Sequence, residues 1–540
     1  MKRFLALFVL TAMVLMLLPS CFVSEFSADV KVSQIDDTQE VLVKIDSEEP
    51  IKKVDVVIKH GDEIVSNLSC DGMTEFSVKA YYGKHTVQVS SISINGKVNK
   101  YEGEITLTAD EYVIAPISGS MPQIYYTLKI KEITNDGEIP AFVWLARPDS
   151  YNWDNLPKNV YAMPTVDKSE VLTHNNYDRM VEVTDKYIKE LYSLNPNSKF
   201  NLYINDFNSY LYLKLLAGNG IPEENYYVTL LSDGGASYTA FNTAFNVDEK
   251  NFDADEKNFD ADEKYSQMAE NLKTLYTQVR EKGDDYYEEN TFAVNTSDFN
   301  QYAYVAAKEM DNVEWWILRP RDGVLCSPDE EFIKTVLTTD KTEGIIEERN
   351  FANPLKAMSD EEKAQLKALY NFNGEMFEQA ENESKKAMMI LGSWATAENE
   401  PDFEDYVNII KAYFGDEFVY YYKGHPNTPT SNHPEKAAQL EKLGLIDVES
   451  SINAELILFF YPDIYMCGYN SSTFMSVESE EMACAIFNMT KEDAKANEGM
   501  AEYRDLIGVY ISEIDDTSYR LELKDGTEKI YNTQTNTFSE

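Results

Sequence analysis

The strongest constraint on the fold is an alternation of short apolar runs with amphipathic segments that begins after Pro116. Residues 200–204 and 226–231 have the composition of strands, and residues 184–194 and 208–217 have helical spacing. A second series starts near Lys386, with strand-like residues 387–392 and 418–422 on either side of a helical segment, 402–414. Strands separated by helical crossovers pair in parallel, so the chain predicts an α/β fold of two lobes with a cleft between them.

Residues 27–115 have a different pattern, in which apolar and polar residues alternate with a period of two. Turn pairs such as Gly61-Asp62 and Asn95-Gly96 separate the runs. About seven short strands are expected, which indicates an all-β, immunoglobulin-like sandwich. This module has no cluster of catalytic residue types, so we expect a spacer or a carbohydrate- or surface-contacting domain.

The first residues have the form of a targeting segment. Lys2 and Arg3 precede an apolar run, residues 4–18, that is short for a membrane span. Leu18-Pro19-Ser20-Cys21 resembles a bacterial lipobox, in which Cys21 carries the lipid after cleavage. We therefore expect a signal peptide over residues 1–21 and a protein anchored by lipid on the exported face of the bacterial cell membrane. An ordinary signal peptide or an uncleaved anchor is the alternative.

Charge and cysteine usage narrow the possible partners. The formal net charge is −45, which argues against nucleic acid as a ligand and disfavours electrostatic binding to an anionic membrane. Cys70, Cys326, Cys467 and Cys484 form no CxxC motif, so no zinc site is expected. Buried free thiols are the default, and pairing of Cys467 with Cys484 stays open.

An acidic heptad repeat covers residues 248–264. Its carboxylates are compatible with calcium, but neither copy has the glycine that an EF-hand loop needs at its sixth position. We therefore expect a solvated acidic helix or a surface duplication.

Polar residues follow three of the apolar runs at the point where each predicted strand ends. Since strand ends in a parallel sheet open onto the ligand crevice, these loops are the predicted functional site. They are Ser232-Asp233-Gly234-Gly235, Lys423-Gly424-His425-Pro426 and the pair Ser471-Ser472.

The residue types in these loops suit transfer from a nucleotide-activated sugar to a hydroxyl. Asp233 suits the general base, and His425, with an ordinary pKa near 6.5, suits the general acid. Ser471 and Ser472 suit a phosphate site without a metal. Each residue also has an ordinary structural interpretation: a turn for Asp233, a loop histidine for His425 and a helix N-cap for the serines.

Two further residues complete the predicted nucleotide site. Lys423 can pair with an oxygen of the base or the phosphate. Glu455 lies among apolar residues, where a carboxylate is costly unless it is paired or bound, and it can accept ribose hydroxyls. The alternative for Glu455 is an exposed helix face.

In this order and at this spacing, Asp-Gly, Lys-Gly-His-Pro, a lone Glu and Ser-Ser resemble the bacterial sialyltransferases of glycosyltransferase family 80, typified by the Pasteurella and Photobacterium proteins. The resemblance covers roughly residues 120–500. It implies a GT-B fold of two Rossmann-like lobes, an N-terminal lobe over 120–385 and a C-terminal, donor-binding lobe with its tail over 386–540. Some family members also have an immunoglobulin-like domain behind a lipoprotein signal.

The resemblance also implies roles for individual residues. Asp233 would be the base and His425 the acid of an inverting reaction on CMP-sialic acid that needs no metal and no cofactor. Lys423 would contact cytosine, Glu455 the ribose, Ser471 and Ser472 the phosphate, and Asn205 the donor sugar. Gly392 and Trp394 would lie on the side of a galactoside-type glycan acceptor. We expect a monomer.

The chain departs from the family pattern mainly on the acceptor side. Ser232 replaces an acidic residue, Gly235 a serine and Asn427 an arginine, and Trp394 follows Gly392 by two positions where the family has four. Acceptor identity and the linkage, α2,3 or α2,6, therefore stay open. Two other hypotheses remain: transfer of another CMP-activated ulosonic acid, and a non-catalytic, glycan-binding surface lipoprotein.

Overall fold

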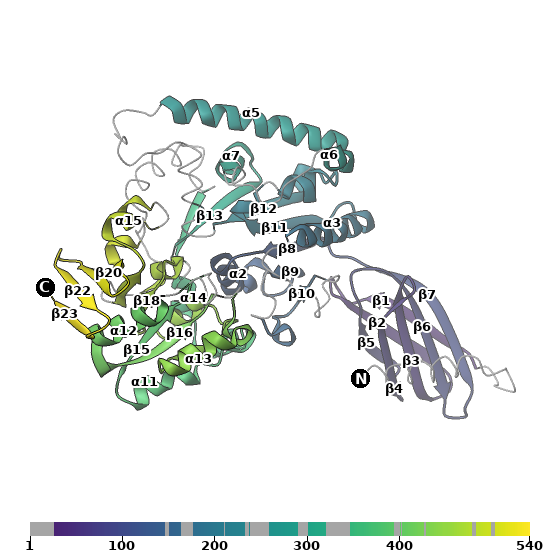
Figure 1. Ribbon diagram of the computed structural model, residues 1–540. Coiled ribbons are helices and arrows are strands. Elements are labelled where there is room, and N and C mark those ends of the chain that lie inside the picture. Colours follow the sequence, from purple (N-terminus) through teal and green to yellow (C-terminus); the bar gives the residue numbers. More distant parts are fainter. Residues whose placement is uncertain are drawn as a thin grey trace. The chain divides into compact units, whose positions relative to one another are not determined.

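The structure is a computed structural model that describes residues 26–145, 151–163, 177–209, 211–232, 237, 259–289, 301–319, 346–350, 352–393, 400, 402–425, 428–477, 482–497, 500 and 503–539. The chain forms two compact units (Figure 1). The N-terminal unit comprises Met1–Asp110 with Glu190–Ser198, and the C-terminal unit comprises Glu111–Lys189 with Lys199–Glu540.

The described part of the N-terminal unit is a two-sheet β structure. One sheet has the order β1-β2-β5 and the other β4-β3-β6-β7, with antiparallel neighbours throughout. The strands are β1 (Ala28–Gln34), β2 (Glu40–Ser47), β3 (Ile51–His60), β4 (Glu63–Asp71), β5 (Glu75–Lys79), β6 (Gly83–Ser93) and β7 (Val98–Leu107). In β2, Val41, Val43 and Ile45 point into the core because alternate side chains of a strand share a face. The predicted all-β module is confirmed, and its immunoglobulin-like assignment stays a prediction.

The module ends earlier than predicted. Strand β8 (Glu111–Ile117) lies inside the predicted range 27–115, yet it pairs in parallel with β9 (Ala141–Leu145) and β11 (Lys199–Asn205) of the C-terminal unit. Almost every residue of β8 is buried, as in strands that are covered on both faces of a sheet. The sequence predicts the start of the α/β region only after Pro116, because β8 has the same strand-like composition as the strands before it.

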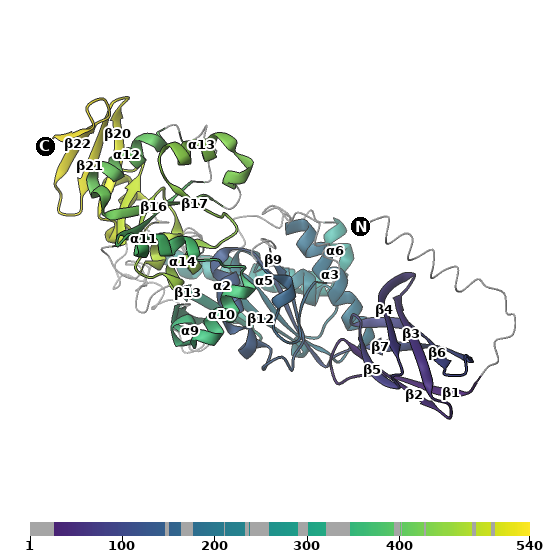
Figure 2. The ribbon, with the colours of Figure 1, turned by 90° about the horizontal axis from the view of Figure 1, so that it is seen from below.

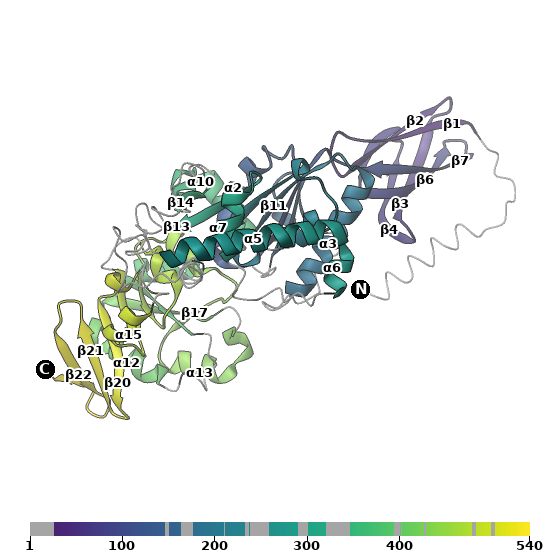
Figure 3. The same ribbon diagram turned by 90° about the horizontal axis from the view of Figure 1, so that it is seen from above.

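The first sheet of the C-terminal unit is parallel throughout. Its order over the described residues is β10-β9-β8-β11-β12-β13-β14. The remaining strands are β10 (Val160–Ala162), β12 (Tyr226–Leu231), β13 (Val313–Arg319) and β14 (Ile346–Asn350). The helices are α2 (Ser120–Ile133), α3 (Tyr177–Leu194), α5 (Phe259–Lys282), α6 (Asp284–Glu289), α7 (Gln301–Glu309), α9 (Ala352–Ala357) and α10 (Asp360–Leu369). Figure 3 shows the long helix α5 running alongside α7.

Helical segments flank this sheet. A capping box begins α10, since Ser359 accepts from the Glu362 N–H and Glu362 accepts from the Ser359 N–H. The acidic repeat is helical from Phe259 onwards, and its earlier residues lie outside the described ranges. The helix predicted over 208–217 is present from Leu211 to Ala217, mostly as the π-helical turn η4 (Leu213–Ala217), and the 3₁₀ turn η3 (Asp206–Asn208) precedes it.

The second sheet has the order β17-β16-β15-β18-β19-β20-β21-β22-β23. Strands β15 (Lys386–Leu391), β16 (Phe418–Lys423), β17 (Ile446–Val448), β18 (Tyr465–Gly468), β19 (Ala483–Phe487) and β20 (Val509–Asp515) are parallel. The helices are α11 (Glu378–Asn382), α12 (Phe403–Phe414), α13 (Pro434–Lys442), α14 (Ala454–Phe460) and α15 (Lys491–Ala496). The thiols of Cys467 and Cys484 are buried on neighbouring strands and form no disulfide, and burial raises the pKa of Cys484 to about 12.

The C-terminal tail adds antiparallel strands to the second sheet. Strands β21 (Ser518–Leu523), β22 (Glu528–Asn532) and β23 (Thr537–Ser539) continue it from β20 (Figure 2). A turn at Lys524-Asp525-Gly526 joins β21 to β22, and Gly526 has the positive φ, 86°, that favours glycine. The sequence signals this turn, but the pairing of β20 with β19 joins distant segments and has no local signature.

Candidate active site at the carboxyl edge of the second sheet

The carboxyl ends of β15, β16 and β18 lie at one edge of the second sheet. The Gly392 N–H donates to the Lys423 carbonyl at 3.0 Å, and the Tyr469 N–H donates to the Leu391 carbonyl at 3.0 Å. The loops after these three strands therefore begin side by side. This is the edge at which parallel α/β sheets bind ligands.

Two glycines allow this close approach. Gly468 has φ +130°, and a Cβ at this position would overlap the backbone of Leu391. A Cβ on Gly392 would overlap the Tyr422 hydroxyl, so side chains are excluded at both strand ends. Gly392 thus has a packing role in addition to the acceptor-side position that the family resemblance implies.

Glu455 and Ser471, which lie on different elements, are joined by Thr473. The Thr473 hydroxyl donates to Glu455 Oε1 at 3.2 Å, and the Ser471 hydroxyl donates to Thr473 Oγ1 at 3.1 Å. Glu455 is 6% exposed in the first turn of α14, so the alternative of an exposed helix face is wrong. Thr473 was not predicted, because a threonine beside two serines has no distinguishing pattern.

Ser471 also caps the short 3₁₀ helix η10 (Ser472–Ser476). Its hydroxyl oxygen accepts from the Thr473 N–H at 3.3 Å, which is the N-cap geometry foreseen as the alternative role. Ser472 is exposed. A phosphate role for the pair remains a prediction.

Lys423 is buried at the end of β16, with 4% of its surface exposed. Its ammonium donates to the Gly424 carbonyl at 3.0 Å and to the Ser450 carbonyl at 3.1 Å, which ties β16 to the segment that leads into α14. Asp447 lies on the neighbouring strand, and burial raises its carboxyl pKa against the opposing influence of Thr430 and the Lys423 charge. We call Lys423, Glu455, Ser471 and Thr473 the carboxyl-edge cluster.

His425 begins the loop after β16 and is half-buried. Its carbonyl accepts from the Thr428 N–H at 2.9 Å, which closes the turn that follows. The histidine therefore lies two residues beyond Lys423 on the same edge of the sheet. Asp233, Trp394 and Cys21 lie outside the described residues.

Asn205 has a structural partner in the first sheet. It is fully buried, its amide nitrogen donates to the Ser118 carbonyl, and its amide oxygen accepts from the Ser118 N–H at 2.7 Å. These bonds join the ends of β8 and β11. Each bond uses one of the two hydrogen-bonding positions of its amide atom, so the predicted contact of Asn205 with a donor sugar stays a prediction.

Neighbouring polar groups in the first sheet were missed by the sequence reasoning. Asp206 is 1% exposed and accepts from the Ser237 hydroxyl at 2.9 Å and from the Trp315 indole N–H at 3.2 Å. Ser232, which precedes Asp233, is buried, and its hydroxyl accepts from the Leu318 N–H at 2.8 Å. The carboxyl ends of β11, β12 and β13 are therefore joined by buried hydrogen bonds.

A buried ion pair contacts the loop that follows β15. Glu400 accepts from the Ser393 N–H at 2.7 Å and from the Lys436 ammonium at 3.0 Å, and the Glu400 and Lys436 side chains are 1% and 6% exposed. The ammonium lies 3.3 Å from the centroid of the Phe403 ring. Burial lowers the pKa of Lys436, and Glu400 opposes this change.

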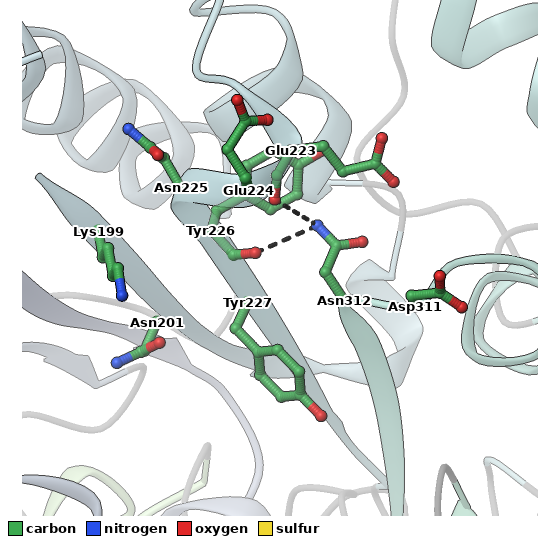
Figure 4. Close-up of a pocket in the computed structure, with 9 residues that line it drawn as sticks. All are labelled: Lys199, Asn201, Glu223, Glu224, Asn225, Tyr226, Tyr227, Asp311 and Asn312. Carbon is green, nitrogen blue, oxygen red and sulfur yellow. Dashed lines mark hydrogen bonds between the residues drawn. The ribbon is translucent and has the colours of Figure 1, made fainter. Parts of the chain in front are cut away.

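An open pocket of 510 Å³ lies elsewhere, on the first sheet (Figure 4). Lys199 and Tyr226, which begin β11 and β12, line it together with Asn312, which precedes β13. It is thus at the amino edge of the sheet, and we place the candidate site at the carboxyl edge of the second sheet instead.

The described ranges contain neither a metal-binding group of side chains nor a membrane-spanning helix. Within them, no group of three or more His, Cys, Asp and Glu side chains is arranged to hold a metal ion. No described helix has both the length and the apolar character needed to span a membrane.

The fold is shared with solved bacterial sialyltransferases. The 2,6-sialyltransferase of Photobacterium sp. JT-ISH-224, solved with the donor product CMP and the acceptor substrate lactose, has a TM-score of 0.50 and 13% identity over 88% of this chain and 91% of its own. A sialyltransferase from Photobacterium damsela has a TM-score of 0.50 and 13% identity, over 90% and 97%. No protein-family model and no curated protein sequence matches the chain. At this identity the likeness establishes the fold: the chain has the two-lobed α/β architecture of these glycosyltransferases.

Proposed function

We propose that this protein is an inverting, metal-independent sialyltransferase that moves sialic acid from CMP-sialic acid to a hydroxyl of a galactoside-type acceptor. The observation that carries the proposal is the carboxyl-edge cluster. Glu455 and Ser471, from different elements, are joined through Thr473. Lys423 donates to the Ser450 carbonyl, in the segment that leads to Glu455, and lies at the edge at which parallel sheets bind ligands. These contacts occur in a fold shared with a sialyltransferase that was solved with CMP and lactose.

The cluster offers the contacts that a cytidine monophosphate needs. The Glu455 carboxylate only accepts hydrogen bonds, which suits ribose hydroxyls. The hydroxyls of Ser471 and exposed Ser472 can donate to phosphate oxygens. The Lys423 ammonium, which donates to the Gly424 and Ser450 carbonyls, is assigned to the cytosine base in this proposal.

The reaction assigned to this site needs a base and an acid. Asp233 takes the proton of the acceptor hydroxyl as its oxygen forms a bond to the anomeric carbon of sialic acid. The bond from that carbon to the phosphate oxygen breaks, its electron pair stays with CMP, and His425 supplies a proton to the departing phosphate. Attack from the side opposite the leaving group inverts the anomeric centre.

The proposal also assigns an acceptor side, a lipid anchor and a role for the N-terminal unit. We place Trp394 on the acceptor side, next to Gly392, and a lipid on Cys21 that holds the protein on the exported face of the bacterial membrane. The N-terminal unit then acts as an immunoglobulin-like spacer between lipid and enzyme. The protein works as a monomer in this proposal.

The test is CMP release from CMP-sialic acid by protein comprising residues 22–540, with and without lactose. Lactose-stimulated release that persists in EDTA supports the proposal, and Asp233→Asn should abolish it while largely sparing CMP binding. His425→Ala should slow release strongly. A strict metal requirement contradicts the proposed chemistry. CMP binding without transfer from CMP-sialic acid, but with transfer from another CMP-ulosonic acid, points to that donor instead.

A further inference from the structure

Asn453 lies at the N-cap of α14 but does not cap the helix. Asparagine is among the preferred N-cap residues, yet its side chain makes no capping hydrogen bond here. The residue is 3% exposed, and its amide nitrogen is buried without a hydrogen-bond partner among the described residues. An unpaired buried donor lowers stability, so a native protein that keeps one invites a functional explanation.

The position of Asn453 points to that explanation. It precedes Glu455 by two residues and follows Ser450, whose carbonyl accepts from Lys423. The unpaired amide thus lies in the segment between Glu455 and the Ser450 carbonyl to which Lys423 donates. Ser476, which ends η10, is 6% exposed and is another buried side chain whose hydroxyl has no partner within the described residues.

We propose that Asn453 is a nucleotide-binding residue that acts with Glu455 on the ribose. This inference rests on the proposed function. A ribose hydroxyl both donates and accepts, whereas a carboxylate only accepts and an amide NH₂ only donates. Glu455 therefore takes the proton of a ribose hydroxyl, and the Asn453 NH₂ donates to an oxygen of the same diol. An oxygen of the bound ribose thus accepts the hydrogen bond of the Asn453 NH₂, for which the described residues provide no acceptor.

The experiment measures binding of CMP, 2′-deoxy-CMP and 3′-deoxy-CMP to the full-length protein by calorimetry, and thermal unfolding with and without CMP. The informative variant is Asn453→Leu, because leucine keeps approximately the size and removes the donor without adding a charge. Asn453→Ala is the second variant. Asn382→Leu, at an exposed position in α11, is the matched control.

We expect Asn453→Leu and Asn453→Ala to weaken CMP binding roughly five- to tenfold, the loss of about one hydrogen bond. The advantage of CMP over at least one deoxy analogue should shrink, while the unfolding temperature of the nucleotide-free protein stays unchanged or rises. Unchanged CMP affinity in both variants overturns the inference. It is also overturned if the unfolding temperature falls and the affinities for all three nucleotides fall by the same factor. If the unsubstituted protein does not bind CMP, the proposed function fails first and this inference fails with it.

Discussion

At the level of single residues, Thr473 is the group that holds the carboxyl-edge cluster together. Its hydroxyl donates to Glu455 and accepts from Ser471, and its N–H donates to Ser471. The side chain is 5% exposed, so neither bond is readily replaced by water. The positions of Glu455 and Ser471 therefore depend on one hydroxyl.

Replacing Thr473 with valine tests this dependence, because valine keeps the shape and removes the hydroxyl. We expect Thr473→Val to lower the free energy of unfolding by about 1–3 kcal/mol, since the buried Glu455 oxygen loses its donor. CMP affinity, measured by calorimetry, should fall several-fold. Thr473→Ser keeps the hydroxyl and should retain most of both. Equal CMP affinity in the valine and serine variants would show that Thr473 does not organise the site.

The Glu400–Lys436 pair is the second residue-scale feature with a measurable consequence. Glu400→Gln leaves the Lys436 charge buried without its counter-charge, so we expect a loss of about 3–5 kcal/mol in the free energy of unfolding. Adding Lys436→Met should recover most of that loss, since the buried charge is then gone. Urea unfolding of both variants provides the measurement. This account is contradicted if Glu400→Gln is as stable as the unsubstituted protein. It is also contradicted if adding Lys436→Met does not raise the free energy of unfolding above that of Glu400→Gln alone.

At the level of elements, most strands could be predicted from their composition. Residues 226–231 are predicted as a strand with the bounds that β12 has, β16 extends one residue beyond its prediction, and β15 is shifted by one residue at both ends. Strands buried on both faces are continuous apolar runs, and the capping box before α10 is a local pattern. The bound that is wrong, at β8, depends on which distant strand pairs with it.

The part of the candidate site that lies at strand ends could be predicted from the sequence, and the contacts between distant residues could not. Lys423, Glu455 and Ser471 follow or flank predicted strands, so their convergence follows from the rule for parallel sheets. The Glu400–Lys436 pair joins residues 36 positions apart, and no local pattern marks it. Asn205 also follows a strand, but its amide is bonded to Ser118, and nothing in the sequence distinguishes that bond from a ligand contact.

The junction of β15 and β18 supplies an element-scale prediction. Gly468→Ala adds a Cβ where φ is +130° and where the Leu391 backbone leaves no room. We expect the second sheet to lose β18 at its carboxyl end, with CMP binding abolished and the unfolding temperature of the protein lowered. Gly526→Ala is the control, since it also places alanine at positive φ but in open space. Equal effects of the two substitutions on CMP binding would contradict the importance of this close approach.

At the level of the whole molecule, the two units should respond differently to pH. His85 is buried in the N-terminal unit, and burial lowers its pKa. The unfolded chain takes up a proton near pH 6.5 and the folded unit does not, so the contribution of His85 to stability is present above that pH and declines as pH falls below it.

Thermal unfolding between pH 7.5 and 5.5 checks this prediction. We expect the transition of the N-terminal unit to move to lower temperature as the pH falls, and His85→Gln to flatten that dependence. His60, whose ring centroid lies 5.4 Å from that of His85, is more exposed, so His60→Gln should leave most of the slope. An unchanged slope in His85→Gln would refute the assignment.

The most direct test of the whole account is a calorimetric titration of residues 22–540 with CMP. The account predicts saturable binding at one site per chain, competed by CMP-sialic acid and weakened in Thr473→Val and in Gly468→Ala but not in Gly526→Ala. No binding of CMP at millimolar concentration, or binding that none of the carboxyl-edge substitutions changes, would contradict a nucleotide site at this edge of the second sheet.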